Sequence, residues 1–561
     1  MNSNKFRSGD SISGLENGFA RSLYKSMGFT DDELTGRPLI GIANSWTNLV
    51  PGHQNFKELA EHVTKGIYRE GGTAVEFGVI AACDGIAEGH IGMKYILPTR
   101  EIITSSIELI AQAHRMDGLV LLGSCDKIVP GMLMAAARLN IPAIVVTGGV
   151  MQGGEVFDGR QTDATSCVEA RGMYQAGKIT QEELMAIEDV SCPGCGSCSF
   201  MGTANSMGCV SEAMGMSLPG SALIPAVMAD RKRVAYDSGR QICDLVKKGI
   251  TARSVINEAS LRNAIRVIQT ISGSTNCVLH LAAIAHEAEL DISALKLFEE
   301  MHKTTPHLVK VNPSSKFNVE DFHRAGGIPK TMANLGSLID RSALTCTGKT
   351  IGENLDNYKH RYRGEPDLIR TPETAYNKTG GIAILRGNLA PDSGVTKPGA
   401  YKSDLHSFKG KARVFDREEE LNTAIIDGKI QPGDVIVIRY EGPKGGPGMR
   451  EMFMCMKLLY GRGLAESTAV VTDGRFSGTN NGCFVGHVSP EAADGGPIAL
   501  VYDGDVIEID VPNGALNLLV EPEELERRRA KWVNNKPDIP WGYLRTYAKL
   551  ASSADKGAII S

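Results

Sequence analysis

The first part of the chain alternates short apolar runs with segments in which apolar residues recur every three or four positions. Phe56, Leu59, Val63 and Ile67, for example, have the spacing of an amphipathic helix and follow an apolar run at residues 39–43. Strands that alternate with helices predict an α/β fold with a mostly parallel sheet covered by helices. The predicted strands are 39–43, 74–82, 118–122 and 142–147, and the predicted helices are 56–67, 102–114 and 132–139.

Longer helical patterns come next, and a polar segment follows them. Ser254 is the expected N-cap of the first of these helices. Residues 358–377 are polar and contain two prolines, which is typical of a linker between domains. We therefore predict an α/β domain over residues 1–370 and a second domain over residues 371–561. The long helices of the first domain are expected at 254–272, 275–288 and 292–303.

The second domain contains many short apolar runs and few helical patterns. This distribution predicts a β-rich, barrel-like domain. A charged helix is expected near its end, at residues 523–532. The predicted strands are 412–415, 435–439, 469–472, 498–501, 506–511 and 516–520.

Composition and charge exclude several classes of protein. The 561 residues are 42% hydrophobic and 22% charged, with a formal net charge of −5, which is ordinary for a globular protein. Lys and Arg form no basic run, so nucleic acid is not an expected partner. We find neither an apolar stretch of ~18 residues nor an N-terminal signal segment, so we expect no membrane partner and a cytoplasmic location. The 12 cysteines are then expected as free thiols, available for metals.

The strongest local motif is a run of three cysteines at Cys192, Cys195 and Cys198. The C-x2-C-x2-C spacing allows the thiols to converge on one soft metal centre. The motif is incomplete for a ferredoxin, because Gly202 occupies the fourth position, and it lacks the second C-x2-C of a zinc ribbon. We favour an iron–sulfur centre. A zinc-binding protein, a redox-active CxxC protein and a turn of unliganded thiols remain alternatives.

Two further candidates follow predicted strands of the first domain. Cys125, Asp126 and Lys127 come shortly after the strand at 118–122, and Asp84 follows another strand. Ligands collect at the carboxyl ends of parallel strands, and carboxylates suit Mg²⁺. Taken singly, however, Cys125 is more typical of a buried small residue, and Asp84 is equally typical of a residue that caps a turn or helix.

The second domain offers two polar turns. A Gly/Pro-rich loop over residues 440–451 ends in Glu451, and the turn at 472–478 carries Ser477. Neither turn has the spacing of a phosphate-binding loop or of a nucleophile elbow. By themselves, the two segments are no more than a long loop and a hydrogen-bonding turn.

Taken in order, these segments resemble the dihydroxy-acid/6-phosphogluconate dehydratase family over nearly the whole chain. The resemblance implies that Cys125 and Cys198 bind an iron–sulfur cluster. It also implies a homodimer or homotetramer. The matching segments are 43–53, 84–86, 125–132, 198–207, 273–276, 439–449, 472–478, 487–492 and 554–557.

The resemblance also assigns a magnesium site and a base. Asp84, Asp126 and Glu451 match Mg²⁺ ligands, and Lys127 matches a lysine that is carbamylated and binds the same ion. Ser477 matches the proposed proton acceptor.

The cluster type depends on one departure from the family pattern. Members with a [2Fe–2S] cluster carry a cysteine where this chain has Gly52. A [4Fe–4S] cluster is therefore favoured, with Cys195 or Cys192 as the third ligand.

The implied reaction is β-elimination of water from a 2,3-dihydroxy carboxylic acid to give a 2-keto acid. Such a reaction needs charge stabilisation beside the carboxylate and a Lewis acid for the departing hydroxyl. The Val-Pro-Gly-His sequence at residues 50–53 favours 2,3-dihydroxyisovalerate and 2,3-dihydroxy-3-methylvalerate, substrates of branched-chain amino-acid biosynthesis. An aldonate or 6-phosphogluconate is the alternative substrate.

Overall fold

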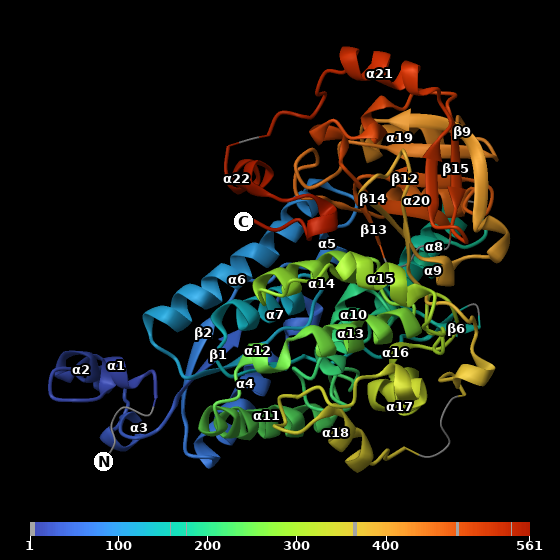
Figure 1. The fold of residues 1–561 in the computed structure, drawn as a ribbon. Helices are drawn as coiled ribbons and strands as arrows, with labels where there is room; N and C mark the ends of the chain where they lie inside the picture. Colours follow the sequence, from blue (N-terminus) through green and yellow to red (C-terminus); the bar gives the residue numbers. More distant parts are fainter. Residues whose placement is uncertain are drawn as a thin grey trace.

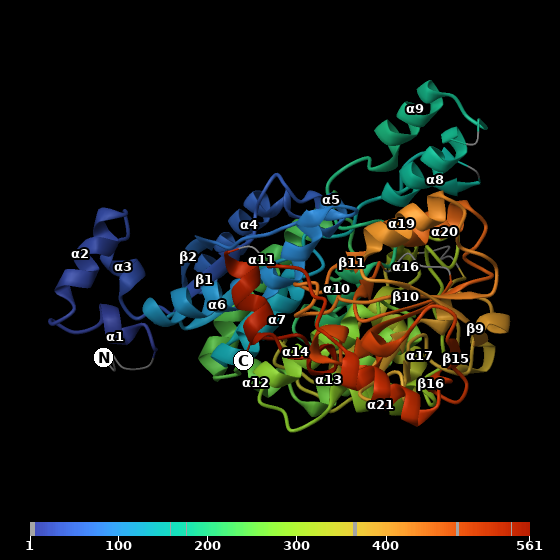
Figure 2. The same cartoon turned by 90° about the horizontal axis from the view of Figure 1, so that it is seen from above.

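The computed structural model describes residues 6–157, 159–175, 177–362, 367–477, 482–539 and 541–560. Two sheets organise these residues, one in each half of the chain. The first sheet and its helices form the lower body in Figure 1, and the second sheet lies above it. A small N-terminal arm of three short helices extends away from both, as Figures 1 and 2 agree. The arm consists of α1 (Gly9–Ile12), α2 (Gly18–Ser26) and α3 (Asp31–Leu34).

The first sheet has four strands in the order β2-β1-β3-β4, and every pairing is parallel. The strands β1, β3 and β4 are fully buried because helices cover both faces of the sheet, whereas β2, at one edge, is only partly buried. Ile40, Ile42 and Val120 face one helix layer, and Leu119 and Leu121 face the other. The predicted parallel sheet is therefore confirmed. The strands are β1 (Leu39–Asn44), β2 (Thr73–Gly78), β3 (Gly118–Leu122) and β4 (Ala143–Val146), and the covering helices are α4 (Phe56–Arg69), α11 (Ala229–Lys248), α6 (Ile96–Ala113) and α7 (Ile128–Leu139).

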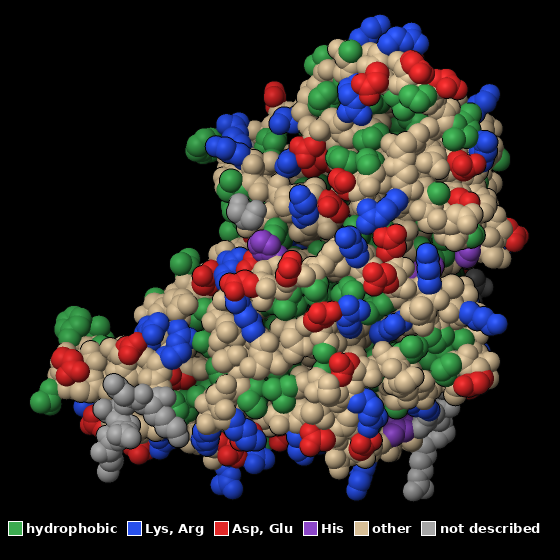
Figure 3. All heavy atoms as spheres, viewed as in Figure 1, with side chains coloured by type: hydrophobic (Ala, Val, Ile, Leu, Met, Phe, Trp, Pro, Cys, Tyr) green, Lys and Arg blue, Asp and Glu red, His purple; other side chains and the backbone are tan. Residues whose placement is uncertain are grey.

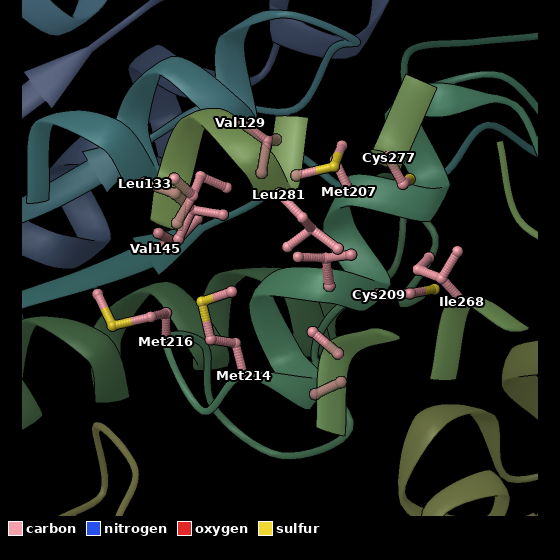
Figure 4. Close-up of a cluster of buried hydrophobic side chains, with 14 of the residues drawn as sticks. Val129, Leu133, Val145, Met207, Cys209, Met214, Met216, Ile268, Cys277 and Leu281 are labelled. Carbon is pink, nitrogen blue, oxygen red and sulfur yellow. The ribbon is translucent and has the colours of Figure 1, made fainter. Parts of the chain in front are cut away.

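A second layer of helices packs against α7 and buries much of the largest core. Figure 4 shows Met207, Cys209, Cys277 and Leu281 among the apolar side chains of this region. Cys209 and Cys277 are fully buried there, as small apolar residues are. The helices of this layer are α10 (Thr203–Ala213), α13 (Glu258–Thr270), α14 (Asn276–Glu287) and α15 (Ala294–His302).

The prediction of one helix capped by Ser254 is wrong. A short helix, α12 (Ala252–Val255), ends there, and α13 begins only after Asn257. The Asn257 side chain accepts a hydrogen bond from the Ser260 amide at 3.1 Å, and the Ser260 hydroxyl accepts one from the Asn257 amide. These two hydrogen bonds start a new helix after Asn257. The chain therefore does not form one continuous helix, although the apolar periodicity continues across residues 256–257.

The second sheet has eight strands in the order β16-β15-β9-β10-β12-β14-β8-β7. Its centre is parallel and its outer pairings are antiparallel. Arg386, directly after β7, pairs with β16 through the Gly514 carbonyl and the Leu516 amide, each at 2.8 Å. The two edges therefore meet, and the predicted barrel-like fold is confirmed. The strands are β7 (Ala383–Leu385), β8 (Ser393–Thr396), β9 (Ser407–Phe415), β10 (Asp434–Ile438), β12 (Ala469–Thr472), β14 (Cys483–Ser489), β15 (Val506–Asp510) and β16 (Ala515–Leu518).

One predicted strand of this half is wrong. Residues 498–501 lie largely within a 3-10 helix, η8 (Pro497–Leu500), whose first residue is proline. Ile498 and Leu500 are nevertheless buried, so the apolar run indicates burial and does not indicate a strand. The charged helix is confirmed as α21 (Pro522–Lys531).

The surface agrees with the mixed charge of the sequence. Acidic and basic side chains alternate over the face shown in Figure 3, and apolar side chains gather at the tip of the arm. Within the described residues, no helix combines the length and the apolarity needed to cross a membrane.

Candidate active site

A cavity of about 360 Å³ lies at the carboxyl ends of the first sheet's strands. Loops that follow β1, β2, β3 and β4 contribute Gly52, Cys83, Cys125 and Met151 to its wall. The second half of the chain contributes Glu451, Phe453 and Ser477 to the wall. This is the edge at which a parallel sheet places ligand-binding loops.

Three buried carboxylates converge in this cavity. One oxygen from each of Asp84, Asp126 and Glu451 lies within 4.8 Å of the others. Asp84 begins α5 (Asp84–Ala87), and its Oδ1 is buried without a hydrogen-bond partner. A buried carboxylate oxygen with no partner is costly unless it binds a cation. The donor set therefore fits a hard divalent ion such as Mg²⁺.

Lys127 lies inside this acidic group and is fully buried. Its ammonium pairs with Asp84 and lies 3.5 Å from Glu451 Oε2 and 3.9 Å from Asp126 Oδ2. Burial alone would lower the pKa of Lys127, but the three carboxylates outweigh it and raise the pKa overall. An unmodified Lys127 thus balances the negative charge at the place that a metal ion would take.

The same burial acts in the opposite direction on Asp126. Burial, and then the charge of Asp84, raise the pKa of Asp126 to about 8. These carboxyl groups consequently favour a cation strongly, because a cation removes their mutual repulsion.

Glu451 is held in place from two sides. Asn276 Nδ2 donates to Glu451 Oε2 at 2.8 Å, and the guanidinium of Arg475 donates to the same oxygen at 2.7 Å. Arg475 also donates to the Met449 carbonyl at 2.7 Å. Sequence reasoning did not assign a role to Asn276 or Arg475, although both belong to segments that match the family.

Four thiols line the same cavity: those of Cys83, Cys125, Cys192 and Cys198. Cys195 is half-buried and does not line it. All twelve cysteines are free thiols. The structure therefore brings Cys125 and Cys198 together, adds Cys83, and leaves Cys195 outside the cavity wall.

Cys125 is fixed by its backbone. The amides of Cys125 and Ser124 donate to His53 Nε2 at 3.2 and 3.3 Å, so His53 Nδ1 must carry the ring proton. That nitrogen lies 2.7 Å from the Ser45 carbonyl. Burial lowers the pKa of His53 to about 4, which keeps the ring neutral and able to accept. The neighbouring thiol of Cys125 lowers the pKa of Cys83 to about 7.

Ser477 reaches the cavity from a short pair of parallel strands, β11 (Glu451–Met452) and β13 (Arg475–Phe476). Its amide donates to the Met452 carbonyl at 3.1 Å, and the residue is 9% exposed. Glu451 and Ser477 are thus delivered by one structural unit. Gly478, the last residue of the Ser477 motif, lies outside the described residues.

Comparisons with known proteins agree with this geometry. Residues 37–354 match the family Dihydroxy-acid/6-phosphogluconate dehydratase N-terminal, and residues 367–558 match its C-terminal counterpart. The chain is 49% identical to a dihydroxy-acid dehydratase of Ruminiclostridium cellulolyticum. It is 50% identical to those of Acetivibrio thermocellus and Pyrococcus furiosus. In all three comparisons the match covers 98% of both chains.

Proposed function

Because the chain belongs to the dihydroxy-acid/6-phosphogluconate dehydratase family, we propose that it removes water from a 2,3-dihydroxy carboxylic acid to give a 2-keto acid. The substrates are 2,3-dihydroxyisovalerate and 2,3-dihydroxy-3-methylvalerate, and the pathway is branched-chain amino-acid biosynthesis. The observation that supports this most directly is the shared cavity, which joins the carboxylates of Asp84, Asp126 and Glu451 to four thiols.

Two kinds of cofactor fit these donors. Asp84, Asp126 and Glu451 would hold Mg²⁺, and Cys125 and Cys198 would hold an iron–sulfur cluster, with [4Fe–4S] favoured over [2Fe–2S]. Cys195, Cys192 or another thiol would complete the cluster ligands. When bound, the two groups supply a hard Lewis acid for the carboxylate end of the substrate and a soft one for the departing hydroxyl.

Ser477 would take the C2 proton on its Oγ. A serine hydroxyl is too weak an acid to act alone near neutral pH, so it needs positive charge in its surroundings. Asp84, Asp126 and Glu451 would provide this indirectly, because they hold a divalent ion in the same cavity. The side chains of Asn276 and Arg475 keep Glu451 in position for that task.

Lys127 is proposed to act as a carbamate. As an ammonium ion it competes with a metal for the oxygens of Asp84 and Glu451. Reaction of its neutral amine with CO₂ forms an N–C bond, releases a proton and leaves an anionic oxygen ligand. Carbamylation would thus convert a competitor of the metal into a ligand.

The cavity wall supports a substrate with a branched alkyl group. Val50, Ile86, Met151, Phe200 and Phe453 present apolar surface to it. Apolar walls favour alkyl groups over sugar hydroxyls, which would lose their hydrogen bonds with water there.

One observation favours the alternative, a sugar-acid dehydratase acting on an aldonate or on 6-phosphogluconate. The carboxyl group of Glu88 also lines the cavity, and its Oε2 is buried without a hydrogen-bond partner. Such a group could bind an additional hydroxyl of a polyhydroxy acid.

Turnover by the anaerobically purified enzyme tests the proposal. We expect 2,3-dihydroxyisovalerate to react with a higher kcat/KM than gluconate or arabinonate. A protein that dehydrates only the sugar acids would overturn the first substrate assignment and support the alternative.

We further propose a cytoplasmic homodimer or homotetramer, with a domain division near residue 370. The separate family matches on either side of residues 355–366 support this division. The exposed apolar side chains of Leu15, Phe19, Leu23 and Met27, on and around α2, support association between chains. Light scattering of the purified protein measures the oligomeric state.

A further inference from the structure

Cys83 holds a position that the proposed function does not yet use. It follows β2, directly precedes Asp84, and lines the cavity together with Cys125 and Cys198. In the sheet order β2-β1-β3-β4, the loops after β2 and β3 flank the loop after β1, which carries Gly52. Cys83 and Cys125 therefore reach the cavity from either side of Gly52.

The thiols of Cys83 and Cys125 are neighbours on the wall of the cavity. Cys83 is only half-buried, so its sulfur is not enclosed by apolar neighbours as the sulfurs of Cys209 and Cys277 are. Two adjacent thiols on the wall of a cavity, beside a third at Cys198, form a donor set suited to a soft metal centre.

Gly52 itself offers no ligand atom, and a larger residue at this position would be tightly packed. A Cβ atom at this position would lie 3.3 Å from the Ser197 amide nitrogen and 3.4 Å from the Ser197 Cα. Both atoms belong to the backbone that immediately precedes Cys198, so a side chain at residue 52 would press against the loop that carries this ligand. A third thiol must come from another segment.

The two cysteines suggested by the sequence motif are less well placed. Cys195 is outside the cavity wall. Cys192 lines the cavity but is exposed at the end of α9 (Gln181–Ser191). Cys192 is therefore the rival of Cys83, and Cys195 is a control within the same motif.

We infer that Cys83 is the third thiolate ligand of the iron–sulfur cluster, together with Cys125 and Cys198, and that it replaces the cysteine absent at Gly52. This inference rests on the proposed function, because it requires that the protein bind such a cluster. Three thiolates leave the cluster without a full set of cysteines, as a Lewis-acid role requires.

Anaerobic reconstitution with ferrous iron and sulfide tests the assignment in Cys83→Ser and Cys83→Ala, with Cys192→Ser and Cys195→Ser in parallel. The measurements are iron and sulfide per chain, the visible spectrum and the electron paramagnetic resonance of the reduced protein. We expect both Cys83 variants to lose most of the iron, while Cys195→Ser retains the wild-type content and spectra. The melting temperature of each variant reports whether it is folded.

Alkylation of the wild-type protein gives a test that does not depend on a variant folding. Iodoacetamide should modify Cys83 in the protein without cluster, and reconstitution should protect Cys83 as fully as Cys125 and Cys198. The inference is overturned if Cys83 remains reactive after reconstitution, or if the Cys83 variants keep wild-type iron and spectra while Cys192→Ser loses them. A wild-type protein that takes up no cluster would overturn the proposed cofactor as well, so the two failures are distinguishable.

Discussion

The guanidinium of Arg475 lies 2.7 Å from the carboxylate of Glu451, and the two residues are opposite each other in the parallel pair β11–β13. This contact joins the turn that carries Ser477 to the acidic group formed by Asp84, Asp126 and Glu451. Glu451 therefore depends for its orientation on a residue that is itself fully buried.

Replacement of Arg475 by Met should weaken Mg²⁺ binding by about 10–100-fold, because residues that orient a metal ligand contribute on this order. Calorimetric titration with Mg²⁺ measures the change. Arg231→Met is a matched control, since Arg231 is equally buried but hydrogen-bonds with Thr147 and Ser221, away from the carboxylates. Equal losses in the two variants would mean that the effect is one of folding.

Sequence patterns predicted the first sheet and placed Asp84 and Asp126 at its ligand-binding edge for the same reason. Strands buried on both faces, such as β3 before Asp126, are recognisable as apolar runs, and Asp84 follows the partly buried strand β2 of the same sheet. The spacing of Cys192, Cys195 and Cys198 indicated a soft metal centre, whereas the roles of Glu451, Ser477 and Cys125 came from the family resemblance. They remain proposals that the shared cavity supports.

Other parts of the site could not be predicted, because their partners are far apart in the chain. Asn276 and Arg475 are 175 and 24 positions from Glu451, and no local sequence pattern predicts such contacts. Cys83 and Cys125 meet only because β2 and β3 are separated by a single strand. The pattern of residues 498–501 does not distinguish a strand from a 3-10 helix, because apolar character indicates burial alone.

Lys127 should bind metal only when carbamylated. We expect Lys127→Met to lose Mg²⁺ affinity, and we expect bicarbonate to raise the affinity of wild-type protein that has been stripped of CO₂. Intact-protein mass spectrometry at neutral pH measures the added CO₂. If Lys127→Met binds Mg²⁺ more tightly than wild type, the residue acts instead as a competing cation.

Ser477→Ala should remove turnover while leaving both cofactors bound. Loss of a general base typically lowers kcat by about 10²–10⁴-fold. Iron content, Mg²⁺ affinity and KM should change little, because Ser477 is not among the proposed ligands. Ser467→Ala, at a half-buried turn serine that does not line the cavity, is the control. A colourless Ser477→Ala protein would contradict the role assigned to this serine.

His53 should make stability fall in mild acid. The pKa of His53 is about 4 in the folded chain, against a usual value of 6.5. Between these two values, His53 binds a proton in the unfolded chain but not in the folded chain. Between pH 7 and pH 5 this linkage removes about 2 kcal/mol of stability. His53→Gln lacks the titrating group. The wild-type advantage in melting temperature should therefore shrink from pH 7 to pH 5, and a constant or growing advantage would contradict the assignment.

Glu88 should control which dihydroxy acids enter the cavity. Burial, and then the charges of Glu451 and Asp84, raise the pKa of Glu88 well above its usual value, so the carboxyl group can donate a hydrogen bond to a hydroxyl. A branched alkyl substrate offers no hydroxyl beyond those at C2 and C3, whereas an aldonate offers several. Removal of the carboxyl in Glu88→Leu should therefore lower kcat/KM for gluconate relative to 2,3-dihydroxyisovalerate by about 10-fold, the effect of one hydrogen bond to a substrate hydroxyl.

Glu88→Gln is the matched variant, since it keeps the shape and a donor but cannot ionise. It should retain most of the wild-type ratio between the two substrates at neutral pH. If Glu88→Leu leaves the ratio unchanged, the unpartnered Oε2 of Glu88 does not contact the substrate chain beyond C3. If both variants lose activity equally on both substrates, the Glu88 carboxyl group contributes to the metal site instead. The charges of Glu451 and Asp84 in that site already raise its pKa.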